Sequence, residues 1–152
     1  MRNDPEPPLS PAEERDLRRV AAMMVPASTE YDVPGADDPT IFADIVKSLG
    51  RDLGDVRRAL GALRESVGGA FADADASRAE VAAAALRDAG GARRAAIERA
   101  ILQCYYRDDR VLRSLNIEPR PPFPKGHVLE QGDWSLLDVV KKRPKMWRDA
   151  PR

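Results

Sequence analysis

The sequence contains very few of the residues on which several kinds of functional site depend. Among its 152 residues there is one cysteine and one histidine, and only 5% of the residues are aromatic. A single cysteine excludes an internal disulfide and a multi-cysteine metal site within one chain. As the only histidine, His127 leaves a Ser-His-Asp triad or a His-rich metal site with at most one member of its commonest base or ligand type. We therefore interpret His127 as a surface residue of a loop.

Charge and hydropathy argue against two further classes of protein. The 25 basic residues balance the 25 acidic residues, so the chain has no global basic field of the kind that nucleic-acid binders use. The longest apolar run covers residues 20–25, whereas a membrane span needs about 20 residues. The run follows Arg18 and Arg19, but it is also too short for a twin-arginine export signal, and we predict no export by this pair.

What the sequence does contain is a series of helix signals. Residues 10–13 form a capping box with proline at the first helical position, and Pro26 ends this first helix. Asp38-Pro39 repeats the start signal and opens the longest amphipathic stretch. We expect that stretch to break near Gly50, because glycine costs a helix about 1 kcal/mol relative to alanine, and to end at Gly68-Gly69.

Two more helices and a helical turn follow. The third helix is capped by Asp75 or Ser77, and Gly90-Gly91 separates it from a fourth helix over residues 92–106. A short helical turn comes next and ends at Asn116, a residue suited to left-handed backbone. No internal repeat is present.

These signals predict a single all-α domain, a small bundle of four to five helices over residues 10–116. A flexible N-terminal arm of residues 1–9 precedes it, and a proline-rich, largely irregular C-terminal arm of residues 117–152 follows it. In the C-terminal arm only residues 134–142, opened by Asp133, have the spacing of a short helix. One domain fits the length, since a single core usually serves about 100–200 residues.

Cys104 and three acidic pairs are the other residues considered for chemistry. Cys104 lies on the apolar face of the fourth predicted helix, where burial raises the pKa of a thiol and makes it inert. The acidic pairs lack the Asp-x-Asp-x-Asp-Gly spacing and distal glutamate of a calcium loop. Helix capping explains them better. They are Asp37-Asp38, Asp73 with Asp75, and Asp108-Asp109.

Five of the eight aromatic residues are concentrated near the C-terminus, mostly in proline-rich chain. Such a chain has too little apolar area to fold alone, so it either wraps the protein's own helices or lies along a partner. Aromatic anchors carry much of the binding energy in protein contacts. We predict partner contact for these five residues: Tyr105, Tyr106, Phe123, Trp134 and Trp147.

Five short stretches occur in an order that resembles a known family. They are residues 9–14, Val25-Pro26-Ala27, Val33-Pro34-Gly35-Ala36, residues 42–45, and residues 104–111. In sequence and order they are similar to the small, third subunit of gluconate 2-dehydrogenase and its relatives. In that family a first helix ends in an Ile/Val-Pro-Ala step, a Pro-Gly-Ala turn and a second helix follow, and a Tyr-x-Asp-Pro-x-Val segment comes later.

Asp109 and Asn116 stand where that family more usually has proline and glycine. The resemblance covers roughly residues 9–126 and implies an accessory subunit without catalytic residues, which binds no flavin or haem itself. It also implies a partner, a large FAD-dependent dehydrogenase of the glucose-methanol-choline type that oxidises alcohol or sugar hydroxyl groups. Because this chain lacks a convincing twin-arginine signal, we expect a cytoplasmic complex, with a periplasmic complex as the alternative.

Two other interpretations remain open at the level of sequence. A free-standing enzyme would need the fold to bring His127 or an acidic pair into a pocket. A regulatory or nucleic-acid-binding helical module would use a basic cluster near the tryptophans, and its binding would fall steeply with salt. A solvated charged tail is the commoner role of such a cluster. The cluster consists of Lys141, Lys142, Arg143, Lys145 and Arg148.

Overall fold

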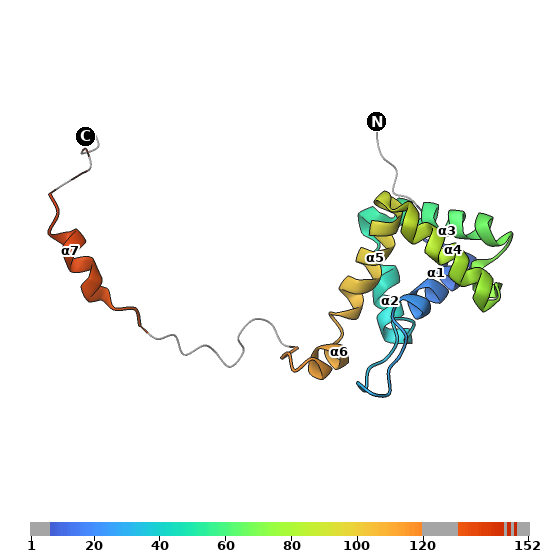
Figure 1. Ribbon diagram of the computed structural model, residues 1–152, viewed down its shortest axis with the longest axis horizontal. Coiled ribbons are helices and arrows are strands. Elements are labelled where there is room, and N and C mark those ends of the chain that lie inside the picture. The colour runs from blue at the N-terminus through green and yellow to red at the C-terminus, as the bar shows by residue number, and fades with distance from the viewer. Residues whose placement is uncertain (1–6, 120–130, 145, 147, 149–152) are drawn as a thin grey trace. The chain divides into compact units, whose positions relative to one another are not determined.

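The computed structural model describes residues 7–119, 131–144, 146 and 148. All the secondary-structure elements assigned within these residues are helices (Figure 1). The chain divides into two compact units, residues 1–119 and residues 120–152. An all-α fold is therefore confirmed. The α-helices of the first unit are α1 (Pro11–Met24), α2 (Pro39–Ser48), α3 (Leu53–Val67), α4 (Ala76–Ala89), α5 (Gly91–Tyr105) and α6 (Asp109–Ser114), with the 3-10 helices η1 (Gly50–Asp52) and η2 (Phe71–Asp73).

Side-chain caps fix the starts of four helices, as the sequence predicts. The Ser10 hydroxyl accepts a hydrogen bond from the Glu13 amide at 3.3 Å, and Glu13 Oε2 accepts one from the Ser10 amide at 2.7 Å. Asp38, Asp75 and Asp108 cap α2, α4 and α6 with their carboxylates. Each cap satisfies amide groups that lack a partner within the helix and typically contributes about 1 kcal/mol.

Gly50 divides the long amphipathic stretch into α2 and α3. Its φ is +44°, in the left-handed region that favours glycine, and η1 separates the two helices. The predicted break is thus confirmed, and with it the described part of the first unit has six α-helices where four to five were predicted. α3 ends at Gly68, with a φ of +70°, and the next amide, that of Gly69, donates to the Arg64 carbonyl at 3.1 Å.

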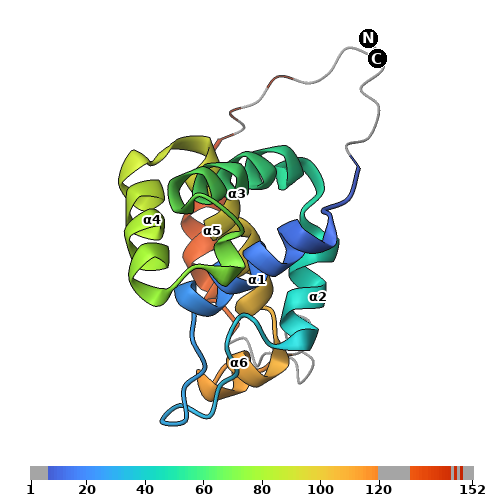
Figure 2. The ribbon, with the colours of Figure 1, turned by 90° about the vertical axis from the view of Figure 1, so that its right-hand side faces the viewer.

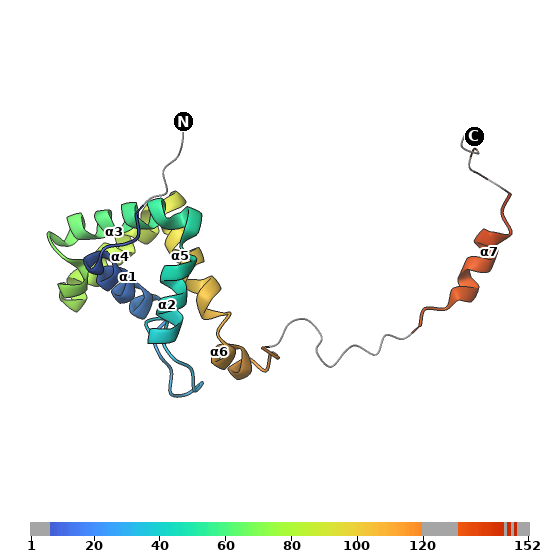
Figure 3. The same cartoon turned by 180° about the vertical axis from the view of Figure 1, so that it is seen from behind.

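α3 and α5 form the centre of the first unit, and the other elements pack around them. α5 lies between α4 and α2 (Figure 2), and α2 runs beside α5 (Figure 3). α1 packs against α3 and η2. Every α-helix of this unit contributes to one apolar core, in which a buried large side chain contributes about 1.5–3 kcal/mol. Examples are Leu17, Ile45, Leu60, Ala82, Ile101 and Val111.

A buried carboxylate joins three elements of this core. Asp16 on α1 is fully buried, and its Oδ1 accepts a hydrogen bond from the Ala72 amide of η2 at 2.8 Å. Its Oδ2 forms an ion pair with Nε of Arg64 on α3, whose side chain is one-third exposed. A buried charge is tolerated only when it is paired and hydrogen-bonded, and both conditions hold here. Sequence reasoning missed Asp16 because it lies among the charged residues of an amphipathic helix.

Residues 7–9 differ from the predicted flexible N-terminal arm. Leu9 is buried in the core of the first unit. Arg57 Nη2 donates hydrogen bonds to the carbonyl oxygens of Pro7 at 2.7 Å and Pro8 at 3.1 Å. The sequence shows only the prolines, which prevent a local helix, and it does not show that an arginine 49 or 50 residues away binds the carbonyl groups they leave free. Residues 1–6 lie outside the described residues.

The described part of the second unit contains one short helical segment. It consists of η3 (Trp134–Leu137) and α7 (Asp138–Lys141). Asp133 Oδ1 accepts a hydrogen bond from the Ser135 amide at 3.0 Å and so begins the segment. This segment lies within residues 134–142, for which the sequence predicted a short helix, and its first half is a 3-10 helix.

Candidate partner-binding site

The structure separates the residues predicted to contact a partner into buried and exposed ones. The ring of Tyr105 belongs to the core, with only 5% of the residue exposed, whereas Tyr106 is 53% exposed. The two rings meet edge to face, with centroids 5.3 Å apart. Trp134 is 66% exposed. Phe123 and Trp147 lie outside the described residues, as does His127.

The burial of Tyr105 has a clear chemical consequence. Removal of its phenol from water raises the pKa of the hydroxyl, and the neighbouring Tyr106 and Asp108 raise it further. Tyr105 therefore stays neutral, and its ring contacts that of Tyr106 edge to face. Tyr106, and not Tyr105, is the member of the pair whose ring a partner can reach without rearrangement of the core.

The helical segment of the second unit leaves an unusual number of apolar side chains exposed. Six large apolar side chains are exposed among the 16 described residues of the second unit, but only five among the 113 described residues of the first unit. A segment of about two helical turns has no core of its own in which to place them. The six are Trp134, Leu136, Leu137, Val139, Val140 and Met146.

Part of this apolar surface forms a hollow with charged edges. Leu137, Val140, Pro144 and Met146 line it together with two cations. The cations are Lys141 and Arg143.

A second exposed apolar group lies at the α6 end of the first unit. The hairpin-like loop of residues 27–34 and α6 line one hollow there, and they occur at the same end of the unit (Figure 3). The loop is shaped by paired hydrogen bonds between Ser28 and Val33, each 3.0 Å long. Four of the five exposed large apolar side chains of the unit come from this loop or from residues adjoining α6. They are Tyr31, Tyr106, Leu115 and Ile117.

Three of the stretches that carry the family resemblance meet at this same end. The amide of Ala36 donates to the Val25 carbonyl at 2.9 Å, which joins residues 25–27 to residues 33–36. Arg110 Nη2 donates to Asp38 Oδ1 at 2.8 Å, and its Nε donates to Asp108 Oδ1 at 3.0 Å. These contacts with Arg110 hold the pKa of both carboxyl groups below the usual range, so both stay ionised at neutral pH.

One residue of each acidic pair caps a helix, as predicted. Asp38, Asp75 and Asp108 cap helices, and Asp73 forms an ion pair with Arg15. Among the described residues there is no group of three or more histidine, cysteine, aspartate or glutamate side chains placed to hold a metal ion.

Cys104 is buried on α5, as predicted. Burial raises the pKa of its thiol, which therefore remains protonated at neutral pH. Arg107 lies beside it, with Nη2 3.6 Å from the Cys104 sulfur, and the same guanidinium donates through Nε to Asp44 Oδ2 at 3.0 Å. Arg107 also donates to the Ser48 hydroxyl at 3.0 Å, so this cluster fastens the end of α5 to α2.

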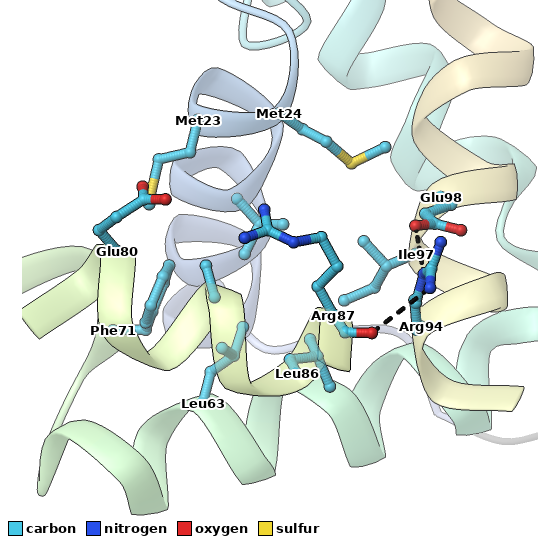
Figure 4. A pocket seen from close by; sticks show the side chains of 12 residues that line it. Met23, Met24, Leu63, Phe71, Glu80, Leu86, Arg87, Arg94, Ile97 and Glu98 are labelled. Atoms are coloured by element: carbon cyan, nitrogen blue, oxygen red, sulfur yellow. Dashed lines mark hydrogen bonds and ion pairs between the residues drawn. The ribbon is translucent and has the colours of Figure 1, made fainter. Parts of the chain in front are cut away.

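The first unit also carries an apolar groove of about 150 Å³ (Figure 4). Its floor and walls come from α1, α3, η2, α4 and α5, and include Met23, Met24, Leu63, Phe71 and Ile97. Its edge is charged, with Glu80 and Arg87 from α4 and Arg94 and Glu98 from α5.

The charged edge of the groove is partly internally paired. Arg94 Nε donates to Glu98 Oε1 at 2.6 Å, and Arg94 Nη1 donates to the Arg87 carbonyl at 3.4 Å (Figure 4). The sequence did not predict the groove. The helical periodicity of each segment was readable, whereas the way five elements converge was not.

The chain matches no protein-family model, no curated protein and no solved structure. In the described residues no helix is both long and apolar enough to span a membrane.

Proposed function

We propose that this chain is a small, non-catalytic subunit that binds and stabilises a large FAD-dependent oxidoreductase of the glucose-methanol-choline type. The partner oxidises alcohol or sugar hydroxyl groups with its own FAD, and this chain binds neither flavin nor haem. The kind of partner comes from the resemblance of residues 9–14, 25–27, 33–36, 42–45 and 104–111 to the third subunit of gluconate 2-dehydrogenase.

The observation that carries the binding role is the exposed apolar surface of residues 134–146. Six large apolar side chains there face solvent within 13 residues. Full burial of one such side chain is favourable by about 1.5–3 kcal/mol. The free energy of burying all six is gained only when another surface covers them. Exposed tryptophan is also among the residues most enriched at the energetic centres of protein interfaces.

Within this proposal Tyr106 and Trp134 are the primary anchors. Both rings are exposed, and Tyr106 is held in place by its edge-to-face contact with Tyr105. Tyr105 then acts as the support and Phe123 and Trp147 as further anchors, in keeping with their aromatic chemistry. An obligate interface of this kind buries more than about 2,000 Å² in total.

The proposal is tested by co-purification of the tagged full chain from its native host, followed by an absorption spectrum of the recovered complex. We expect a stoichiometric partner of flavoprotein size with an oxidised-flavin spectrum. A solitary, colourless and well-folded chain would contradict the proposal. Turnover of an alcohol or sugar by the chain alone would favour the free-standing enzyme instead.

The anchors are tested in the same assay with Tyr106→Ala and Trp134→Ala. Each substitution is expected to cost about 2 kcal/mol of binding free energy or more, because truncation of an interface anchor leaves an unfilled pocket on the partner. Val81→Ala is the matched control, since Val81 is 67% exposed on α4 and belongs to neither apolar group. Equal recovery of flavoprotein by all three variants would remove Tyr106 and Trp134 from the interface.

A further inference from the structure

The balanced charge of the whole chain conceals a strongly basic segment. Residues 139–148 contain five lysine or arginine residues and no acidic residue. The rest of the chain therefore holds 20 basic residues against 25 acidic ones. Positive charge is thus segregated at the C-terminal end of the exposed helical segment, although the net charge of the protein is zero.

The acidic residues of the same segment are already engaged. Asp133 begins the segment through hydrogen bonds to the amide and hydroxyl of Ser135, at 3.0 and 2.6 Å. Asp138 forms an ion pair with Lys141 at 3.3 Å. Lys142 and Arg143 follow directly and are exposed. The segment therefore presents carboxylates at its beginning and an excess of cations at its end.

The cations adjoin the apolar side chains that the proposed function assigns to the interface. Lys141 and Arg143 line the same hollow as Leu137, Val140 and Met146. A surface that covers these three apolar groups consequently brings its own edge against the two cations. Covering them with a neutral or basic surface would remove water from Arg143 without an opposite charge in return, and would leave Lys141 with the exposed Asp138 alone.

We infer that residues 133–148 dock into an apolar groove of the partner protein whose edge carries carboxylates. This inference rests on the proposed function and states the chemistry of the receiving surface. The groove accommodates Trp134, Leu137 and Val140, and its carboxylates face Lys141, Lys142 and Arg143. The positive end of the segment also attracts the partner before contact, which raises the rate of association.

The charge pattern favours a protein surface over a phosphate-rich one. Asp133 precedes Trp134 directly, and Asp138 lies between the apolar residues Leu137 and Val139. Both carboxylates are repelled by a nucleic-acid backbone or an anionic lipid surface. A protein groove can place carboxylates at one end only, which suits a segment whose two ends differ in charge.

The test compares two triple charge reversals in the full chain. K141E/K142E/R143E alters the basic end of the segment, and K47E/R51E/R93E alters three exposed basic residues of the first unit by the same total charge. The rate of association with the purified flavoprotein, recovered with the tagged wild-type chain, is measured at about 0.02 and 0.3 M salt, where screening differs strongly. K141R/K142R serves as the conservative variant.

The segment variant is expected to associate at least about tenfold more slowly at low salt and to lose most of the salt dependence. The control variant and the conservative variant are expected to stay within about twofold of the wild type. Equal slowing in the two triple variants would overturn the inference, because total charge and not the segment would then set the rate.

Two further measurements separate the alternatives. The first is binding of the wild type and the segment variant to phosphatidylserine vesicles and to single-stranded RNA. If the segment variant loses such binding while its association with the flavoprotein is unchanged, the inference is overturned in favour of a phosphate-rich ligand. Normal flavoprotein binding by the segment variant would contradict this inference alone. Failure of the wild-type chain to bind any flavoprotein would contradict the proposed function itself.

Discussion

Arginine–carboxylate pairs join distant parts of the first unit, but they differ greatly in burial. Asp16 is fully buried beneath Arg64, whereas the pair of Arg15 with Asp73 is more than half exposed on both sides. Exposed pairs contribute little because water screens them and the long side chains lose freedom, typically about 0–1 kcal/mol. A buried carboxylate that loses its partners costs much more. The two aspartates therefore allow a direct comparison within one protein.

We predict that Asp16→Ala destabilises the protein much more than Asp73→Ala does. Asp16→Ala leaves the Ala72 amide and the Arg64 guanidinium without their shared acceptor, and it should lower the free energy of unfolding by about 3 kcal/mol. Asp73→Ala should lower it by less than about 0.5 kcal/mol. Urea unfolding of both variants measures the difference. Similar losses in the two variants would show that burial does not govern these pairs.

At the scale of elements, the helices begin and end where local chemistry is explicit in the sequence. The Ser10 capping box, the Asp38 and Asp108 caps and the break at Gly50 are all confirmed. Asn116, with a φ of +59°, also has the predicted left-handed backbone after α6. Such signals act within about five residues, so one sequence is enough to read them.

Two glycines of the α2–α3 region should respond oppositely to alanine. Gly50 has a φ of +44°, so Gly50→Ala forces a side chain into left-handed backbone and should cost about 1 kcal/mol, although the added carbon meets no atom within 4 Å. Gly61 lies inside α3 with equally open space, so Gly61→Ala should stabilise the protein by about 0.5–1 kcal/mol. Thermal unfolding followed by circular dichroism checks both signs. A stabilising Gly50→Ala would mean that the break does not depend on backbone conformation.

At the scale of the whole molecule, the features that could not be predicted depend on contacts across long sequence distances. The groove of Figure 4 needs Met23, Phe71 and Ile97 to converge from three elements. The placement of residues 7–9 depends on Arg57, and the burial of Tyr105 depends on the packing of α5. The exposed segment of the second unit was easier to predict, because proline and aromatic content reveal it without knowledge of packing.

The arrangement of the core leads to a prediction for the chain as a whole. Every residue of the described apolar core lies between Leu9 and Val111. A chain that ends at residue 119 should therefore keep helices α1 to α6 and lose only the short helical segment of residues 134–141. Its free energy of unfolding should change by less than about 0.5 kcal/mol. The same chain should bind the flavoprotein at least about 100-fold more weakly, since the exposed apolar segment is gone.

Helical content is measured by circular dichroism, the free energy of unfolding by urea unfolding, and the affinity by binding to the purified flavoprotein. A chain that ends at residue 148 is the control, because it retains the exposed apolar segment. A large loss of stability in the chain that ends at residue 119 would support the other hypothesis that the sequence left open, in which the C-terminal arm wraps the protein's own helices. Retained stability with lost binding is expected only if the apolar side chains of residues 134–146 are reserved for another surface.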